Sequence, residues 1–211
     1  MADTLERCRL YLVSPPKIAL PQFSEDLKAA LAAGDVACFQ LRLKPASDEE
    51  ILKAAEALLH VCREQGVEFL VNDRPDLAKR AGADGVHVGQ EDMGVAEARA
   101  ILGPDATIGA TCHASRDLAF TAGEQGADYV AFGAFYPTTT KETAHRPTPE
   151  ILRWWSGLSE IPCVAIGGIT PENAKPLVAA GANFIAVSSA VWSHAQGPAA
   201  AVKAFNQALS D

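Results

Sequence analysis

Four polar clusters in this chain each stand where an apolar run ends. They occupy residues 40–44 (Gln-Leu-Arg-Leu-Lys), 72–73 (Asn-Asp), 89–92 (Gly-Gln-Glu-Asp) and 137–141 (Pro-Thr-Thr-Thr-Lys). When a chain repeats strand and helix, the residues that follow the strands gather at one end of a barrel. Acids, cations and hydroxyls that converge there would form a metal-assisted site for a phosphorylated anion.

Two aspartates in these clusters are candidate metal ligands. Asp73 follows the third predicted strand and Asp92 the fourth, so we expect their carboxylates to meet at the barrel mouth. Mg2+ is commonly held by one or two carboxylates that leave room for waters and substrate phosphate. For either residue alone, the alternative is that it caps the helix that follows it.

Cations accompany the two acids. Arg42 and Lys44 alternate with apolar residues, so we expect them to lie with Gln40 on one side of the second strand. Charges that face a barrel interior are costly unless an anion pairs with them. Lys141 adds a third cation after the sixth strand. Three cations and Mg2+ against two aspartates leave about +3, which suits a diphosphate ester of roughly −2 to −3.

A second anion site is expected near the end of the chain. Gly167-Gly168 opens a helix, and Ser188-Ser189 ends the eighth predicted strand. The loops after the last two strands of such barrels bind phosphate through backbone N–H groups. We therefore predict a site there for a single phosphate.

Two histidines lie close to the predicted site. His113 follows the fifth strand, where it is either a general acid or base or a polar residue packed at the rim. His87 lies inside the fourth strand and is predicted to be a hydrogen-bonded core residue.

The elements that must position these residues are short apolar runs of regular spacing. Near-continuous hydrophobicity over such lengths is typical of strands buried on both faces, as in parallel sheets. The predicted strands are Arg9–Ser14, Ala37–Leu43, Glu68–Asn72, Gly85–Gly89, Thr107–Thr111, Tyr129–Gly133, Pro162–Gly167 and Phe184–Ser188.

Segments rich in Ala, Leu and Glu separate these strands and predict helices. They are Ser47–Gln65, Ser115–Gln125 and Thr170–Ala180, the first with a capping box of Ser47 and Glu50. Nearly the same junction, Gly-Ala followed by Asp or Asn, links helix to strand at residues 82–84, 126–128 and 181–183. Glycine suits the left-handed position that ends a helix. This serial pattern predicts an α/β fold, a parallel (β/α)8 TIM barrel that forms a single domain over 1–211, with a doubly wound open sheet as the alternative.

Composition narrows the class of protein. The formal charge of −8 argues against non-specific binding to nucleic acid or to an anionic membrane. No apolar stretch approaches the roughly 18–20 residues that span a bilayer, and no signal peptide is visible, so a cytoplasmic location is expected. Five cysteines without Cys-x-x-Cys spacing indicate reduced, buried thiols.

The order of these motifs resembles the thiamine-phosphate synthase (thiamine-phosphate pyrophosphorylase) family from about Tyr11 to Trp192. The resemblance is carried by QLRLK, NDRPDLA, GADGVHVGQED, GADYVAFGAFYPTTTK, VAIGGITPENA and AVSSAV. It implies a TIM-barrel transferase that joins hydroxymethylpyrimidine diphosphate to hydroxyethylthiazole phosphate, with Mg2+ assisting a dissociative departure of diphosphate. The products would be thiamine phosphate and diphosphate.

The resemblance also implies a role for each matched residue. Asp73 and Asp92 would bind Mg2+. The pyrimidine diphosphate would be held by Gln40, Arg42, Lys44, Asn72, Thr111 and Lys141, of which Arg42, Lys44, Thr111 and Lys141 are the expected catalytic residues. The thiazole phosphate would be held by Thr138, Thr139, Thr140, Gly168, Ser188 and Ser189. The expected partners are these small phosphorylated substrates and, as an open possibility, further copies of the chain.

Three positions depart from the family pattern. Leu43 replaces the usual acid, Pro45 stands where the family often has Asp, and Thr111 stands where Ser is more frequent. Strand alternation would point Leu43 away from the pocket, and Thr111 keeps the hydroxyl. Two alternatives remain. One is a thiazole tautomerase, since such isomerases resemble this family and use a histidine at the position of His113; the other is a non-catalytic binder of phosphate ligands.

Overall fold

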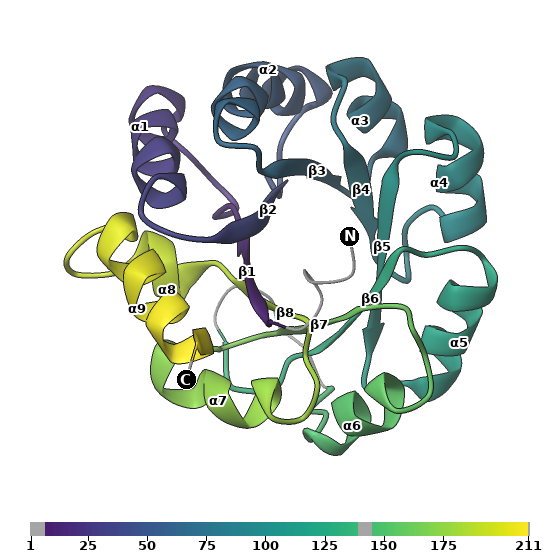
Figure 1. The fold of residues 1–211 in the computed structure, drawn as a ribbon. Coiled ribbons are helices and arrows are strands. Elements are labelled where there is room, and N and C mark those ends of the chain that lie inside the picture. Colours follow the sequence, from purple (N-terminus) through teal and green to yellow (C-terminus); the bar gives the residue numbers. More distant parts are fainter. Residues whose placement is uncertain (1–6, 139–144, 211) are drawn as a thin grey trace.

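The computed structural model of the chain describes residues 7–138 and 145–210, in which strand and helix alternate as far as β8 and two helices follow it (Figure 1). The strands are β1 (Arg9–Val13), β2 (Val36–Leu41), β3 (Glu68–Asn72), β4 (Gly85–Val88), β5 (Thr107–His113), β6 (Tyr129–Gly133), β7 (Cys163–Ile166) and β8 (Phe184–Val187). The helices are α1 (Leu20–Leu31), α2 (Asp48–Glu64), α3 (Pro75–Ala81), α4 (Val95–Leu102), α5 (Arg116–Glu124), α6 (Glu150–Ser156), α7 (Pro171–Val178), α8 (Ser189–Trp192) and α9 (Pro198–Ser210).

The strands close into a parallel barrel in chain order, with the helices in a ring outside it (Figure 1). Closure is made by β1 and β8, where Arg9 pairs with Phe184 and Leu12 with Val187. The predicted (β/α)8 barrel is confirmed, and the open doubly wound sheet is excluded because an open sheet has two edge strands, whereas here every strand pairs on both sides.

Alternation along the strands divides the apolar residues into two layers. Side chains such as Leu10, Leu12 and Phe39 face the helices and form the larger core. Tyr11 and Val13, one position along, face the barrel interior with Cys38, Leu70, Tyr129, Ala131, Val164 and Ala186. Burial on both faces explains why the strands are almost uniformly apolar in sequence.

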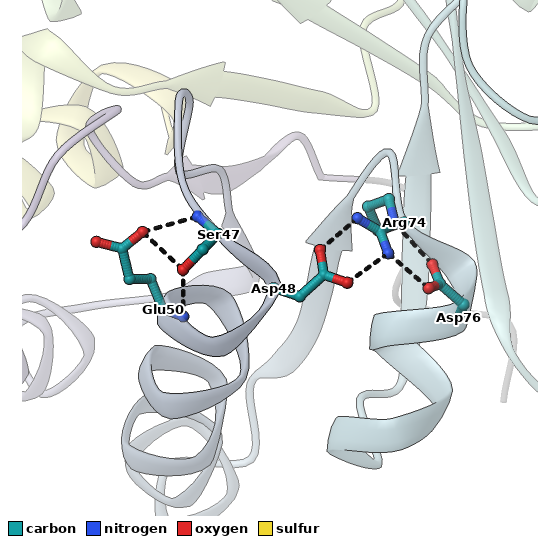
Figure 2. Close-up of polar contacts among 5 residues, drawn as sticks. All are labelled: Ser47, Asp48, Glu50, Arg74 and Asp76. Atoms are coloured by element: carbon teal, nitrogen blue, oxygen red, sulfur yellow. Dashed lines mark hydrogen bonds and ion pairs between the residues drawn. The ribbon is translucent and has the colours of Figure 1, made fainter.

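Helix α2 begins as the sequence predicted. The backbone N–H of Glu50 donates to Ser47 Oγ at 3.2 Å, and the N–H of Ser47 donates to Glu50 Oε2 at 2.7 Å (Figure 2). This reciprocal pair satisfies two N–H groups that the first turn leaves without helical partners. The predicted helices at 47–65, 115–125 and 170–180 all form, each one or two residues shorter at its ends.

The repeated Gly-Ala-Asp/Asn junction fixes strand register at the N-terminal end of the barrel. Asp84 donates its N–H to Phe69 O at 3.0 Å and accepts the N–H of Phe69 on Oδ2 at 2.8 Å. Asp128 makes the same two bonds with Ile108, and Asn183 with Cys163. The preceding glycines are left-handed, with φ of 69°, 86° and 98°, as predicted. Each junction therefore pins its strand to the strand before it.

The five cysteines, all within the described ranges, are free and buried, as the sequence indicated. Among the helices of the described residues, none is long and apolar enough to cross a membrane.

Candidate active site at the barrel mouth

A cavity of about 550 Å3 lies at the C-terminal ends of the strands, where the polar clusters follow the apolar runs. Its lining includes predicted site residues from nearly every part of the chain: Gln40, Arg42, Lys44, Asn72, Asp73, Asp92, Thr111, Thr138, Gly168, Ser188 and Ser189. Thr139, Thr140 and Lys141, also predicted for the site, lie outside the described residues. The sequence therefore located one shared cavity, whereas the role of each lining residue stays a prediction.

Asp73 occupies a constrained position directly after β3. Its φ is +63°, in the left-handed region that non-glycine residues seldom adopt, and its side chain is 11% exposed. Lys44 Nζ forms an ion pair with Asp73 Oδ2. That oxygen is nevertheless buried without a well-oriented hydrogen bond from any described residue. A buried carboxylate oxygen left in this state is suited to a further cationic partner.

Asp92 lies beside Asp73 in the same cavity. Its Oδ2 accepts the backbone N–H of Gly89 at 3.0 Å. Burial raises the pKa of the Asp92 carboxyl, and the neighbouring Asp73 carboxyl raises it further. Neither acid caps a helix, because the N-cap residues of α3 and α4 are Arg74 and Gly94. The capping alternative is therefore wrong for both.

These two carboxylates fit a divalent cation that draws its other ligands from elsewhere. Within residues 7–138 and 145–210, no group of three or more His, Cys, Asp or Glu side chains could enclose a metal ion. Mg2+ is commonly held by one or two carboxylates, with waters and substrate phosphate completing its shell. Asp73 and Asp92 are the residues that would hold it.

The polar cluster at residues 40–44 reaches the cavity from a strand that is shorter than predicted. Strand β2 ends at Leu41, two residues before the predicted end at Leu43, so Arg42 and Lys44 lie beyond the strand. The chain after β2 is held by the residue that follows β1, since Ser14 Oγ accepts the N–H of Arg42 at 2.8 Å. Both cations line the cavity, whereas Leu43 does not and packs against the outer core, as predicted.

Arg74 holds the loop that carries Asp73, and no pattern in the sequence indicated this. Its guanidinium donates to Asp48 at 2.6 and 3.0 Å and to Asp76 at 2.7 and 2.8 Å. Figure 2 shows the guanidinium between the two carboxylates, one on α2 and one on α3. Arg74 lowers the pKa of both carboxyls by hydrogen bonding to their charged forms. These four hydrogen bonds, which we call the Arg74 clamp, join the first turns of α2 and α3 directly beside Asp73.

The opposite side of the cavity is built from the loops after β7 and β8. Gly168 has φ +64°, and a Cβ there would lie 2.3 Å from Pro137 O, so only glycine allows the loop after β6 to approach so closely. Ser188 precedes the first turn of α8, which begins at Ser189. The free N–H groups of such a turn are suited to an anion.

Both histidines singled out in the sequence line the cavity. His87 is buried, with Nδ1 2.9 Å from Tyr129 Oη and Nε2 2.8 Å from Thr111 Oγ1, so the predicted hydrogen-bonded core residue is confirmed and also reaches the site. His113 has φ +52°, and its ring centroid lies 4.6 Å from that of His145. Its role as acid, base or rim residue stays open.

Sequence reasoning missed two tyrosines on the floor of the barrel. Tyr11 on β1 and Tyr129 on β6 point inward, and their hydroxyls lie 2.8 Å apart. Tyr11 also donates to Gln40 Oε1 at 2.9 Å. Their alternation with Leu10, Leu12 and Val130 was the signal that could have placed them inside the barrel.

Comparison with known proteins agrees with this geometry. A family model described as thiamine monophosphate synthase matches residues 10–191. The chain belongs to the thiamine monophosphate synthase family. That match spans every strand of the barrel except the first residue of β1, so the whole cavity falls within the family's domain.

Relatives of this thiamine monophosphate synthase family member carry the corresponding names. Thiamine-phosphate synthase of Rhodospirillum centenum is 59% identical, over 96% of this chain and 98% of the relative. That of Hyphomonas neptunium is 53% identical, over 98% and 97%. The solved structure of a thiamine phosphate pyrophosphorylase from Pyrococcus furiosus superposes with a TM-score of 0.85 at 33% identity, covering 99% of this chain and 96% of the other.

Proposed function

We propose that this chain is a thiamine-phosphate synthase, a transferase that condenses 4-amino-5-hydroxymethyl-2-methylpyrimidine diphosphate with 4-methyl-5-(2-hydroxyethyl)thiazole phosphate. The products are thiamine phosphate and diphosphate. One observation carries the proposal: a single cavity has acids and cations on one side and a glycine-serine loop pair on the other. Family membership and relatives up to 59% identical over nearly the whole chain support the same reaction.

The acid and cation side suits the diphosphate of the pyrimidine substrate. Arg42 and Lys44 provide positive charge, and Asn72 provides amide donors. Lys141 is proposed as a further cation here. Asp73 and Asp92 would hold Mg2+, which when bound supplies positive charge to the leaving diphosphate. Arg42, Lys44, Thr111 and Lys141 are the residues that we propose act on the reacting groups.

The opposite side suits the single phosphate of the thiazole substrate. Gly168, Ser188 and Ser189 line it, together with Thr138. Backbone N–H groups and hydroxyls at this place in a barrel are effective donors to phosphate oxygens. Thr139 and Thr140 complete the proposed set. Two anions bound on opposite walls would bring the pyrimidine methylene and the thiazole nitrogen together between them.

The chemistry needs positioning and charge more than proton transfer. Diphosphate leaves from a carbon attached to an electron-rich aminopyrimidine, so the developing cation is stabilised by the ring itself. The chain's residues then neutralise the leaving group and align the thiazole nitrogen. Val13, Ile166 and Ala186 supply an apolar part of the lining, which limits the access of water to the cation.

We also propose that the protein works in the cytoplasm on these small substrates, without nucleic acid or membrane partners. The charge of −8 supports this, and self-association into a homo-oligomer is compatible with it.

A thiazole tautomerase is the second candidate, and the presence of His113 in the cavity lining favours it. Such an isomerase has no use for a diphosphate and metal site, so Asp73, Asp92, Arg42 and Lys44 together weigh against it. A non-catalytic ligand binder is disfavoured for the same reason, because these groups are intact.

The deciding experiment is a coupled assay on the purified chain. Both phosphorylated substrates are supplied with Mg2+ or with EDTA, and thiamine phosphate is followed. Product that depends on Mg2+ establishes the synthase. Absence of product from folded protein refutes it, and the thiazole carboxylate tautomers are then tested for isomerisation.

A further inference from the structure

A continuous series of hydrogen bonds crosses the floor of the cavity, and the proposed reaction does not account for it. We call it the polar relay; it runs through Thr111, His87, Tyr129, Tyr11, Gln40 and Asn72. The six side chains come from six different strands, β5, β4, β6, β1, β2 and β3. Both ends of the relay, Thr111 and Asn72, line the cavity, as do His87 and Gln40.

The amide of Gln40 gives the relay a direction. Its Oε1 has only lone pairs, so the Tyr11 hydroxyl donates to it at 2.9 Å. Tyr11 has then used its hydrogen and accepts that of Tyr129 at 2.8 Å. Burial raises the pKa of both phenols well above the ordinary value, so each hydroxyl keeps its hydrogen at neutral pH. On the other side, Gln40 Nε2 donates to Asn72 Oδ1 at 2.6 Å.

This direction determines the tautomer of the buried histidine. Because the Tyr129 hydroxyl donates to Tyr11, its oxygen accepts from Nδ1–H of His87 at 2.9 Å. In the neutral ring Nε2 then carries no hydrogen, and it accepts the hydroxyl of Thr111 at 2.8 Å. All five hydrogens therefore point the same way along the relay, from Thr111 toward Asn72.

We propose that Tyr11, Tyr129 and His87 are positioning residues that fix the hydrogen-bond polarity of Thr111 and Gln40 toward the pyrimidine substrate. Thr111 gives its hydrogen to His87, so it offers only lone pairs to the cavity and selects a ligand N–H donor such as an amino group. Asn72, whose Oδ1 is occupied, offers amide hydrogens to an anion. The identity of the ligand rests on the proposed function, but the direction of the hydrogen bonds along the relay does not.

The opposite polarity is the competing state. Turning both amides around would reverse every bond and move the His87 hydrogen to Nε2. Thr111 would then become a donor, and Asn72 would present its carbonyl oxygen beside the proposed diphosphate. That arrangement sets lone pairs against an anion, so the direction from Thr111 to Asn72 is the one compatible with the charge of the site.

The tautomer is measured by nitrogen NMR on full-length protein with labelled histidine, without substrate. Loss of one signal set in His87→Asn assigns the ring. We expect a neutral ring with hydrogen on Nδ1 and none on Nε2. Hydrogen on Nε2 alone, or on both nitrogens, overturns the proposal. This readout is independent of catalysis, so it decides the relay even if the protein makes no thiamine phosphate.

Kinetics test the functional consequence through Tyr129→Phe, which removes one hydroxyl from the middle of the relay and keeps the ring. We expect about a tenfold rise in KM for the pyrimidine diphosphate, the effect of one lost hydrogen bond, with little change for the thiazole phosphate. The single His87 tautomer should also be lost. An unchanged KM for the pyrimidine diphosphate in folded Tyr129→Phe overturns the positioning role.

Two controls separate positioning from a general loss of structure. Tyr136→Phe removes a hydroxyl that donates to Asn173 O at 2.8 Å, outside the relay, and should leave the His87 tautomer unchanged. Thr111→Val keeps the size of the side chain and removes its hydroxyl, so it should raise KM for the pyrimidine diphosphate as Tyr129→Phe does. If Tyr129→Phe fails to fold, Tyr11→Phe interrupts the same relay at the next hydroxyl and is judged by the same criteria.

Discussion

Arg74 donates to both carboxylate oxygens of Asp48, which lies 26 positions earlier in the chain at the first turn of α2. The same guanidinium donates to Asp76 at the first turn of α3. Because Arg74 directly follows Asp73, this clamp restrains the backbone of a residue held at φ +63°. We therefore expect these hydrogen bonds to help orient the Asp73 carboxylate.

Replacing Arg74 by lysine should weaken metal use without unfolding the protein. Lysine keeps the charge but lacks the planar fork that donates to two carboxylates at once. We expect the Mg2+ concentration for half-maximal activity to rise about tenfold, as for other groups that orient metal ligands. Arg80→Lys on the same helix is the control. Equal Mg2+ requirements in the two variants would show that the clamp does not orient Asp73.

The Arg74 clamp should also make the stability of the folded protein depend on pH in the acid range. The pKa values of Asp48 and Asp76 are lowered in the folded state by hydrogen bonds from Arg74. A lowered pKa gives stability that is present above the unfolded value, about 4, and is lost as the pH falls through the folded value. Thermal unfolding of wild type and Arg74→Ala should therefore differ at pH 6 to 8 and converge near pH 2. If the melting temperatures of wild type and Arg74→Ala still differ at pH 2, the packing of the Arg74 side chain accounts for the difference instead.

Asp92→Asn should separate stability from activity. Burial and the adjacent Asp73 raise the pKa of Asp92, so its ionisation lowers stability as the pH rises above the unfolded value, about 4, and the full cost is reached above the folded value. In EDTA at neutral pH the variant should melt at or above the wild-type temperature. With Mg2+, its formation of thiamine phosphate should fall by at least about 100-fold. A folded variant with full activity would remove Asp92 from the metal site.

Lys44→Met should affect one substrate selectively. Lys44 is paired with Asp73 and lines the acid side of the cavity, so we expect KM for the pyrimidine diphosphate to rise by at least about tenfold. KM for the thiazole phosphate should change less than about twofold, because that subsite lies across the cavity. Lys53→Met, at an exposed position on α2, is the matched control. Equal changes for both substrates would contradict the two-sided arrangement.

Gly168→Ala should be far more damaging than Gly66→Ala. Both glycines have φ near +65°, so an added Cβ costs each about 1 kcal/mol in backbone conformation. At Gly66 nothing lies within 4 Å of that Cβ, whereas at Gly168 it would meet Pro137 O at 2.3 Å. Chemical denaturation should show a further loss of roughly 1–3 kcal/mol for Gly168→Ala. Similar losses at the two sites would mean that the loop after β6 moves aside freely.

Local patterns in the sequence predicted the barrel well. Buried parallel strands are short apolar runs, so Tyr129–Gly133 and Glu68–Asn72 were predicted with their observed ends. The capping box of Ser47 and Glu50 depends on neighbours three residues apart and was equally visible. Family membership, inferred from the order of the polar motifs, is confirmed by the matching family model.

Features that depend on distant partners were not predictable in this way. Strand β2 ends at Leu41, two residues earlier than predicted, and the bond from the Arg42 N–H to Ser14 Oγ that holds the next segment was not foreseen. The clamp of Arg74 needs Asp48, and the polar relay needs six strands. Neither is visible until the barrel brings its parts together.

The junctions that pin β4, β6 and β8 to the strands before them have a consequence for how the chain folds. Each joins residues only 15 or 20 positions apart, so register can form within a single repeat. Closure of the barrel is a long-range contact instead, since it pairs β1 with β8, the first and last strands of the chain. Until β8 emerges from the ribosome, the growing sheet carries open edges that invite pairing with another chain. Because the earlier repeats already hold their register, only the pairing of β1 with β8 remains to be made once β8 is present.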